Sequence, residues 1–357
     1  MKKTIAFIFV IFLLLTLFSP IYEAQNQEKL VVFDESNEIS YKYYNYQNLT
    51  NLLHDLQKNH SDLMSLESLG KTYHGRDIWL VKISDNVNEE EDEPGVLLMG
   101  AHHGNEPDSF EVLIYFIEYL VENSSEERVK RAINNTQIYI IPMVNPDGVE
   151  ANTRKNCEPN YGPFGFREKI TSIGVDLNRN YGHRWYNYFL RPWYYLMMSQ
   201  LKDSEYNYRG EKPFSESETT AVKWFVDSHN ISISLSYHGY LSSVMYPWWC
   251  SMLPTRDENL FISVASNISN INNYQIQGRN YYLGYRGASG TSEDWLYGEH
   301  GILAFCIELA FPQKAEDVVN NCITHLEVNL YICEIAEFIH TKQKTWLETH
   351  NGIHSLR

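Results

Sequence analysis

Stretches with apolar residues at helical spacing alternate with short continuous apolar runs along the first half of the chain. The segment YNYQNLTNLLHDLQKNH has the helical spacing and predicts a helix near residues 46–59. The runs DIWLVKIS (77–84) and GVLLMGA (95–101) predict two strands, of which the second is the more buried. From Pro107 the pattern DSFEVLIYFIEYLVEN is helical again, and the run QIYIIPMV (137–144) predicts a further strand.

The order strand, helix, strand is typical of a parallel-rich sheet that is covered by helices. The chain contains no internal repeat, no low-complexity linker and no sign of a second domain. We therefore expect one large α/β domain with a mixed, mostly parallel twisted sheet of about eight strands, flanked by helices on both faces. Further strands are expected at 232–238 and 301–309, and further helices near 215–229, 257–272 and 314–340.

The chain begins with MKKTIAFIFVIFLLLTLFSP, in which two lysines precede an apolar run from Ile5 to Phe18. This pattern predicts a secretory signal over residues 1–24 and export of the remainder. Tyr22 stands where a small residue is expected before a cleavage point near Ala24, so an uncleaved membrane anchor is the alternative. No later segment approaches a membrane span, so contact with a membrane is expected only here. The expected division is a signal at 1–24, a lead-in at 25–40, a main domain at 41–345 and a tail at 346–357.

Composition and charge narrow the class of protein. Of the 357 residues, 43% are hydrophobic and 14% are aromatic, which is enough for a substantial core. The formal net charge of −16 argues against binding to nucleic acid, because a phosphate backbone requires a basic surface. The five cysteines lack Cys-x-x-Cys spacing, so they allow at most one or two disulfides and are poor candidates for metal ligands.

The segment MGAHHGNEPDSF carries the first candidate chemistry, because it joins a buried strand to a helix. Ligand sites form at such junctions, at the carboxyl edge of a sheet. His103 and Glu106 are three residues apart, so at a turn that enters a helix both can face one point, whereas His102 points elsewhere. An imidazole and a carboxylate suit zinc, which needs a third protein ligand in a catalytic site. The alternative is that Glu106 only caps the helix and interacts with its dipole.

Two later strands carry polar residues in apolar surroundings. His238 closes the strand SISLSYH, where it is either a core histidine or the third metal ligand. Glu308 lies in the run GILAFCIEL, where an unpaired carboxylate is costly to bury, and an acid beside a metal can act as a general base. Arg154, and Arg179 beside Asn178, lie in loop-like segments and either clamp a carboxylate of a ligand or form surface contacts.

Taken together, these residues resemble the zinc carboxypeptidases of the carboxypeptidase A, B and T family. The resemblance extends from about residue 41 to the low 340s. The block GVDLNRN is very specific, whereas His-x-x-Glu alone is not, and the interval from Asp294 to Glu308 also agrees with the family. Six blocks follow the order of the family: His103-Gly-Asn-Glu106, NPDG at 145–148, RKN at 154–156, GVDLNRN at 174–180, SYHGY at 236–240, and ASGTSEDW followed by FCIEL.

The resemblance implies one zinc ion per chain, held by His103, Glu106 and His238. It also implies that Glu308 is the base that takes a proton from the zinc-bound water and returns it to the leaving amine. Arg154 would polarise the scissile carbonyl and stabilise the oxyanion.

The same resemblance implies that Asn178 and Arg179 bind the free carboxylate at the end of a peptide, which restricts such an enzyme to chain ends. The chain also departs from the family. Asn105 precedes the glutamate ligand where carboxypeptidase A members have an arginine, although His-Gly-Asn-Glu recurs in the regulatory branch. The tyrosine that closes over the substrate should stand at the position of Arg286, and Tyr285 becomes its equivalent if one residue has been inserted there.

Glu293 falls where the family places the residue at the floor of the specificity pocket, and an acid there marks members that remove Lys or Arg. The alternative is that Glu293 is turned away or pairs with Arg286. The leading hypothesis is an exported, zinc-dependent exopeptidase that removes the last residue of peptides or proteins, with a preference for basic residues. The alternatives are an N-acyl amino acid deacylase of the same fold, a peptidoglycan-trimming carboxypeptidase, and a pseudoenzyme that binds peptide ends or zinc without cleavage.

Overall fold

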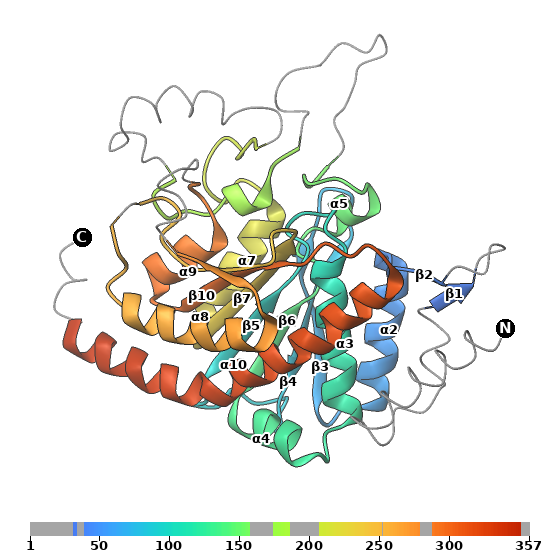
Figure 1. Ribbon diagram of the computed structural model, residues 1–357, viewed down its shortest axis with the longest axis horizontal. Coiled ribbons are helices and arrows are strands. Elements are labelled where there is room, and N and C mark those ends of the chain that lie inside the picture. The colour runs from blue at the N-terminus through green and yellow to red at the C-terminus, as the bar shows by residue number, and fades with distance from the viewer. Residues whose placement is uncertain are drawn as a thin grey trace, which may run out of the picture.

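The structure is a computed structural model and describes residues 31–33, 39–157, 174–185, 207–251, 253–278 and 288–350 (Figure 1). Its centre is a sheet of eight strands, which confirms the expected number. These are β3 (Met64–Lys71), β4 (Asp77–Ile83), β5 (Gly95–Met99), β6 (Gln137–Ile141), β7 (Ile231–Gly239), β8 (Ser243–Met245), β9 (Gln275–Gln277) and β10 (Leu303–Leu309). Their order across the sheet is β3-β4-β6-β5-β7-β10-β8-β9.

The middle of the sheet is parallel. Strands β6, β5, β7 and β10 pair in parallel, one after the other. Antiparallel pairs flank them, β4 with β6 and β3 with β4 on one side and β8 with β10 on the other, and β9 is parallel to β8. Because parallel strands end at the same edge of a sheet, the segments that follow β5, β7 and β10 lie near one another.

Helices cover both faces of this sheet, as expected (Figure 1). The side chains of β5 alternate between the two faces, with Val96 and Leu98 in one core and Leu97 and Met99 in the other. This strand is apolar throughout because both of its faces are buried. The first face carries α2 (Tyr46–Asn59), α3 (Asp108–Glu122), α4 (Glu127–Asn135), α8 (Glu258–Asn272) and α10 (Ala315–His350), and the second carries α7 (Ser217–Ser228) and α9 (Ser292–His300).

Some elements depart from the expected division of the chain. The expected lead-in contains β1 (Val31–Phe33) and the start of β2 (Ile39–Tyr41), which pair in antiparallel fashion. Helix α10 passes the expected domain end at residue 345 and continues to His350. Two short helices, α5 (Pro146–Glu150) and the 3-10 helix η3 (Leu177–Arg179), lie in segments expected as loops. The expected signal at 1–24 lies outside the described residues.

Each of the five cysteines is a free thiol, so none of the disulfides that the count allowed is formed. Among the described residues, no helix combines the length and the apolar character that crossing a membrane requires.

Candidate metal and catalytic centre

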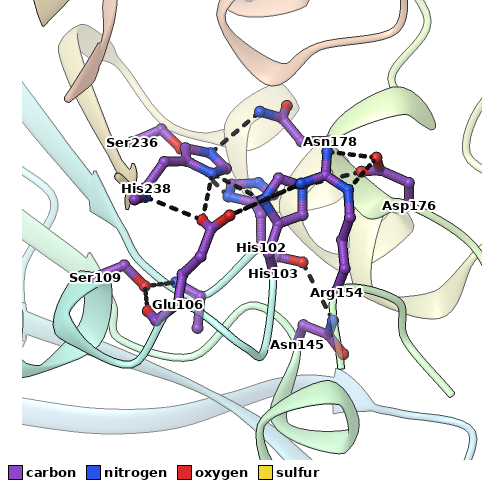
Figure 2. A network of polar contacts seen from close by, with 12 residues as sticks. His102, His103, Glu106, Ser109, Asn145, Arg154, Asp176, Asn178, Ser236 and His238 are labelled. Carbon is purple, nitrogen blue, oxygen red and sulfur yellow. Dashed lines mark hydrogen bonds and ion pairs between the residues drawn. The ribbon is translucent and has the colours of Figure 1, made fainter. Parts of the chain in front are cut away.

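His103, Glu106 and His238 lie together at the carboxyl edge of the sheet (Figure 2). The first two lie between the end of β5 at Met99 and the start of α3 at Asp108, and His238 is the penultimate residue of β7. All three side chains are buried, and their ligand atoms lie within 4.8 Å of one another. Because β5 and β7 are parallel neighbours, the turn after one strand and the end of the other face the same point. The three expected metal ligands therefore form one cluster.

The two imidazoles present the same nitrogen to Glu106. His103 Nδ1 lies 2.9 Å from Glu106 Oε1, and His238 Nδ1 lies 3.1 Å from Glu106 Oε2. The two Nδ1 atoms are 3.2 Å apart. Burial favours a protonated carboxyl, but the two histidines outweigh it and hold the pKa of Glu106 below its ordinary value. Two imidazole nitrogens and an ionised carboxylate that converge on one point are a donor set that fits zinc.

Asp176 supports the outer nitrogen of His103. Its Oδ1 lies 3.0 Å from His103 Nε2, and its Oδ2 accepts hydrogen bonds from Arg154 Nε at 2.9 Å and Nη2 at 2.7 Å. Burial opposes ionisation of Asp176, but Arg154 and His103 hold the pKa of this carboxyl well below its usual range. A carboxylate on the outer nitrogen fixes the orientation of the ring and leaves Nδ1 for a metal. The sequence did not single out Asp176, although it is the acid of the block GVDLNRN.

Two groups face the outer nitrogen of His238. Ser236 Oγ lies 3.2 Å and Asn178 Nδ2 lies 3.1 Å from His238 Nε2. The other atom of this amide, Asn178 Oδ1, accepts a hydrogen bond of 2.8 Å from the backbone N–H of Ser292. Asn178, which was expected to bind substrate, is thus held between the metal cluster and the first turn of α9.

The two arginines of the expected site lie around the same cluster. Arg154 Nη1 is 3.1 Å from His103 Nδ1 and 3.8 Å from Glu106 Oε1. Arg179 Nη1 donates a hydrogen bond of 2.6 Å to the carbonyl oxygen of Asn178. The guanidinium group of Arg154 therefore lies directly beside the cluster, and that of Arg179 lies against the backbone of Asn178.

Glu308 is the neighbour of His238 in the sheet. The parallel pairing of β10 with β7 places the two residues opposite each other. Burial, reinforced by the negative charge of Glu106, raises the pKa of the Glu308 carboxyl. Among the described residues, Oε2 of Glu308 has no hydrogen-bond partner. The structure thus holds a second carboxyl group, with one unsatisfied oxygen, directly beside the candidate ligands.

Glu293 and Cys306 are both fully buried next to His238. Their ligand atoms and a nitrogen of His238 lie within 4.8 Å of one another, so they form a second group with the composition of a metal site. The two groups share His238, whose Nδ1 faces Glu106 and whose Nε2 faces Ser236. Within the described part of the chain, neither oxygen of Glu293 has a hydrogen-bond partner.

The expected substrate-closing Tyr285 and its neighbour Arg286 belong to the segment 279–287, outside the described residues. The alternative in which Glu293 pairs with Arg286 falls outside them for the same reason.

Gly104 allows two blocks of the sequence to touch. A Cβ atom at Gly104 would lie 1.9 Å from the carbonyl carbon of Gly148 and 2.2 Å from its oxygen, so no side chain fits there. The turn that carries His103 thereby packs against α5. Asn145, which caps α5 by accepting from Gly148 N, also donates a hydrogen bond of 3.2 Å to the carbonyl oxygen of His102 (Figure 2). The block NPDG therefore supports the backbone of the metal cluster.

An α/β sheet with a His, Glu, His cluster beside a partly buried glutamate is typical of metal-dependent hydrolases. A family model described as zinc carboxypeptidase matches residues 49–348, and the chain belongs to this family.

Individual relatives are distant. The chain is 27% identical over 289 residues to a zinc carboxypeptidase of Saccharothrix mutabilis subsp. capreolus, with 76% of this chain and 63% of the relative covered. It is 28% identical over 312 residues to zinc carboxypeptidase A 1 of Drosophila melanogaster, with 81% and 69% covered. The chain thus spans less than two thirds of the first relative.

The fold agrees with a solved structure. Carboxypeptidase A from Helicoverpa armigera superposes with a TM-score of 0.69 at 20% sequence identity, over 83% of this chain and 74% of the other. The likeness in fold thus extends over most of the chain.

Proposed function

We propose that this protein is a zinc-dependent exopeptidase that hydrolyses the C-terminal residue of peptides. The observation that carries the proposal is the cluster of His103, Glu106 and His238 with Glu308 paired beside it in the sheet. A module that only binds zinc or peptide ends has no need for a carboxylate at that position, since burying its Oε2 without a partner is costly.

The residues around the cluster have separate tasks in the proposed reaction. Zinc, when bound by His103, Glu106 and His238, supplies a Lewis acid and lowers the pKa of water. Glu308 takes a proton from the attacking water at its unsatisfied Oε2 and returns it to the leaving amine. Arg154, held by Asp176, donates N–H groups to the carbonyl oxygen as that oxygen gains negative charge.

The restriction to chain ends is assigned to Asn178 and Arg179. An amide and a guanidinium match the two oxygens of a terminal carboxylate, and the Asn178 amide lies beside His238 while the Arg179 guanidinium lies against the carbonyl oxygen of Asn178. Tyr285 is proposed to close over the bound substrate.

A preference for basic terminal residues rests on Glu293. Its buried, unpaired carboxylate is fixed near the cluster because the next residue, Asp294, accepts backbone hydrogen bonds from Trp249 N at 2.9 Å and Cys250 N at 2.8 Å. The side chains of Met245, Trp249, Ala288 and Cys306 form an apolar group next to it. The apolar side chains suit the long aliphatic stem of a Lys or Arg residue, and the carboxylate of Glu293 suits its cationic end.

The test is an assay of blocked dipeptides with and without a chelator, repeated with Glu308→Gln. We expect activity to disappear on chelation and to return with Zn²⁺. The substitution should lower kcat by about 10²-fold or more while Zn²⁺ still binds. The exposed Glu67→Gln on β3 serves as the control and should match the unmodified protein. Activity that survives both treatments would contradict the mechanism, and faster turnover of N-acetyl amino acids than of dipeptides would favour the deacylase.

We also propose that the protein is exported, on the basis of the apolar segment within residues 1–24. Fractionation of producing cells tests this directly. Recovery of the protein from the soluble cell interior alone would contradict it, and recovery from membranes would favour the uncleaved anchor.

A further inference from the structure

A buried chain of polar groups leads away from His238 on the side opposite Glu106. Ser236 Oγ lies 3.2 Å from His238 Nε2 and 3.3 Å from His102 Nδ1. The other nitrogen of that ring, His102 Nε2, lies 2.9 Å from the hydroxyl of Tyr181. All four side chains are at most 2% exposed. The contacts join residues up to 134 positions apart in the sequence, so only the fold brings them together.

The Ser236 hydroxyl is the group that can support His238 once Nδ1 binds a metal. In that state the ring carries its proton on Nε2, and this N–H needs an acceptor. Asn178 presents its amide nitrogen there, because its oxygen is taken by the backbone of Ser292. The Ser236 hydroxyl can accept from His238 and at the same time donate to His102.

His102 and Tyr181, at the far end of this series of polar contacts, are held in place by ring stacking and a backbone hydrogen bond. His102 stacks on His238 with ring centroids 5.5 Å apart and an angle of 19°. Tyr181 stacks on Trp295 of α9 at 5.4 Å, and its backbone N–H donates to the carbonyl oxygen of Gly290 at 3.0 Å. A Cβ atom at Gly290 would lie 2.1 Å from the carbonyl oxygen of Arg179, so glycine permits this close approach.

We infer that His102, with Ser236 and Tyr181, is a positioning residue that fixes the ring of His238 for metal binding. The inference rests on the proposed zinc site. It gives the two histidine ligands different supports, a carboxylate behind His103 and a chain of hydroxyl, imidazole and phenol behind His238. The residue next to a metal ligand in the sequence thereby acts on the other ligand.

The test measures Zn²⁺ affinity by competition with a chromogenic chelator, so it does not depend on activity. Ser236→Ala should raise the Kd for Zn²⁺ by about 10-fold, the usual effect of removing a partner of a metal-binding histidine. Tyr181→Phe should cause a smaller rise. The double variant should lose less affinity than the sum of the two single changes, because the hydrogen-bonded route from Tyr181 to His238 passes through Ser236.

Tyr237→Phe is the matched control. It also removes a buried phenol, whose hydrogen bond of 2.7 Å to Asn329 lies in the core on the other face of β7. Its metal-free form should lose melting temperature as Tyr181→Phe does, with the Kd for Zn²⁺ unchanged.

Three results overturn the inference. If the unmodified protein binds Zn²⁺ and Ser236→Ala binds it equally well, the polar contacts through Ser236 do not position His238, while the proposed function stands. If the effects of the two substitutions add, Tyr181 acts by another route, and the assigned path through Ser236 is contradicted. If the unmodified protein does not bind Zn²⁺, the proposed function falls and the inference falls with it.

Discussion

Burying the side chain of the single residue Glu293 costs free energy of folding. It is fully buried in the first turn of α9, and neither of its oxygens meets a hydrogen-bond donor among the described residues. A buried carboxylate without a partner destabilises a fold unless a ligand or cation completes it. The helix N-terminus offsets only part of this cost. A cationic ligand group at this position would offset the remaining cost, in keeping with the proposed preference for basic residues.

We predict that Glu293→Gln weakens the preference for a basic terminal residue. The substitution should lower the ratio of kcat/KM for hippuryl-Arg over hippuryl-Phe by about 10-fold or more, since removing one charge of a buried pair costs at least about 2 kcal/mol. The same substitution at the exposed Glu299 of α9 should leave the ratio unchanged. Faster hydrolysis of hippuryl-Phe by the unmodified protein would contradict the basic preference outright.

Single residues differ in how far the sequence reveals them. His103 and Glu106 are visible from their spacing, because both belong to one turn. Asp176 is not visible in this way, since its contact with His103 spans 73 positions and depends on the packing of two loops. Ser236 is one of several serines in an apolar strand, and only its contacts with His102 and His238 distinguish it.

At the scale of elements, the turn between β5 and α3 depends on its contact with α5. Gly104 approaches the backbone of Gly148 so closely that the two segments have a single way to pack. The Cβ atom of any other residue would push the turn away from α5 and displace His103 from its partners.

We therefore predict that Gly104→Ala destabilises the protein by at least about 2 kcal/mol and weakens Zn²⁺ binding, because both segments must move. Urea unfolding and chelator competition measure the two effects. Gly75→Ala is the comparison, since a Cβ atom there meets nothing within 4 Å and only the φ of +78° opposes it. That change should cost about 1 kcal/mol and leave Zn²⁺ affinity unaltered. Equal losses in the two variants would show that the contact with Gly148 is not what matters.

Several long, periodic elements could be predicted from the sequence, whereas β3, α4 and the shortest elements were not expected. Helix α2 and strands β5 and β10 have clear periods or continuous apolar runs, because each buries a defined face. Strands β8 and β9 have three residues each, too few to show a period. Helix α9 was missed because polar residues fill its buried first turn, which serves the site rather than the core.

At the scale of the whole molecule, the chain entering the domain is fastened to α3 through a buried acid. Glu111 accepts a hydrogen bond of 2.7 Å from the backbone N–H of Tyr44 and one of 2.8 Å from the hydroxyl of Tyr41. Burial raises the pKa of Glu111 to about 8, although these hydrogen bonds oppose the shift. The folded protein thus holds a proton there that the unfolded chain releases near pH 4.3.

Stability should consequently depend on pH at this residue. Because the folded pKa is raised, its contribution is complete below about pH 4.3 and is lost as the pH rises through about 8. Relative to Glu111→Gln, the unmodified protein should lose up to about 1.4 kcal/mol per pH unit across this window. Urea unfolding at several pH values measures the difference. The exposed Glu122→Gln on the same helix should keep the slope of the unmodified protein, and parallel curves for Glu111→Gln would contradict the assignment.

The pairing of β7 with β10 limits where insertions and deletions can be tolerated in this fold. Glu308 stands opposite His238, so the backbone ladder, and not a loop, sets the distance between them. Sliding β10 by two residues would keep its carboxylate on the same face but move it by about 6.6 Å, out of reach of the metal cluster. Deletions inside these strands would therefore separate the proposed base from the candidate metal ligands, whereas the connecting loops can lengthen or shorten without doing so. If the proposed function holds, changes in the loops can alter substrate choice while the arrangement of Glu308 and the candidate ligands stays the same.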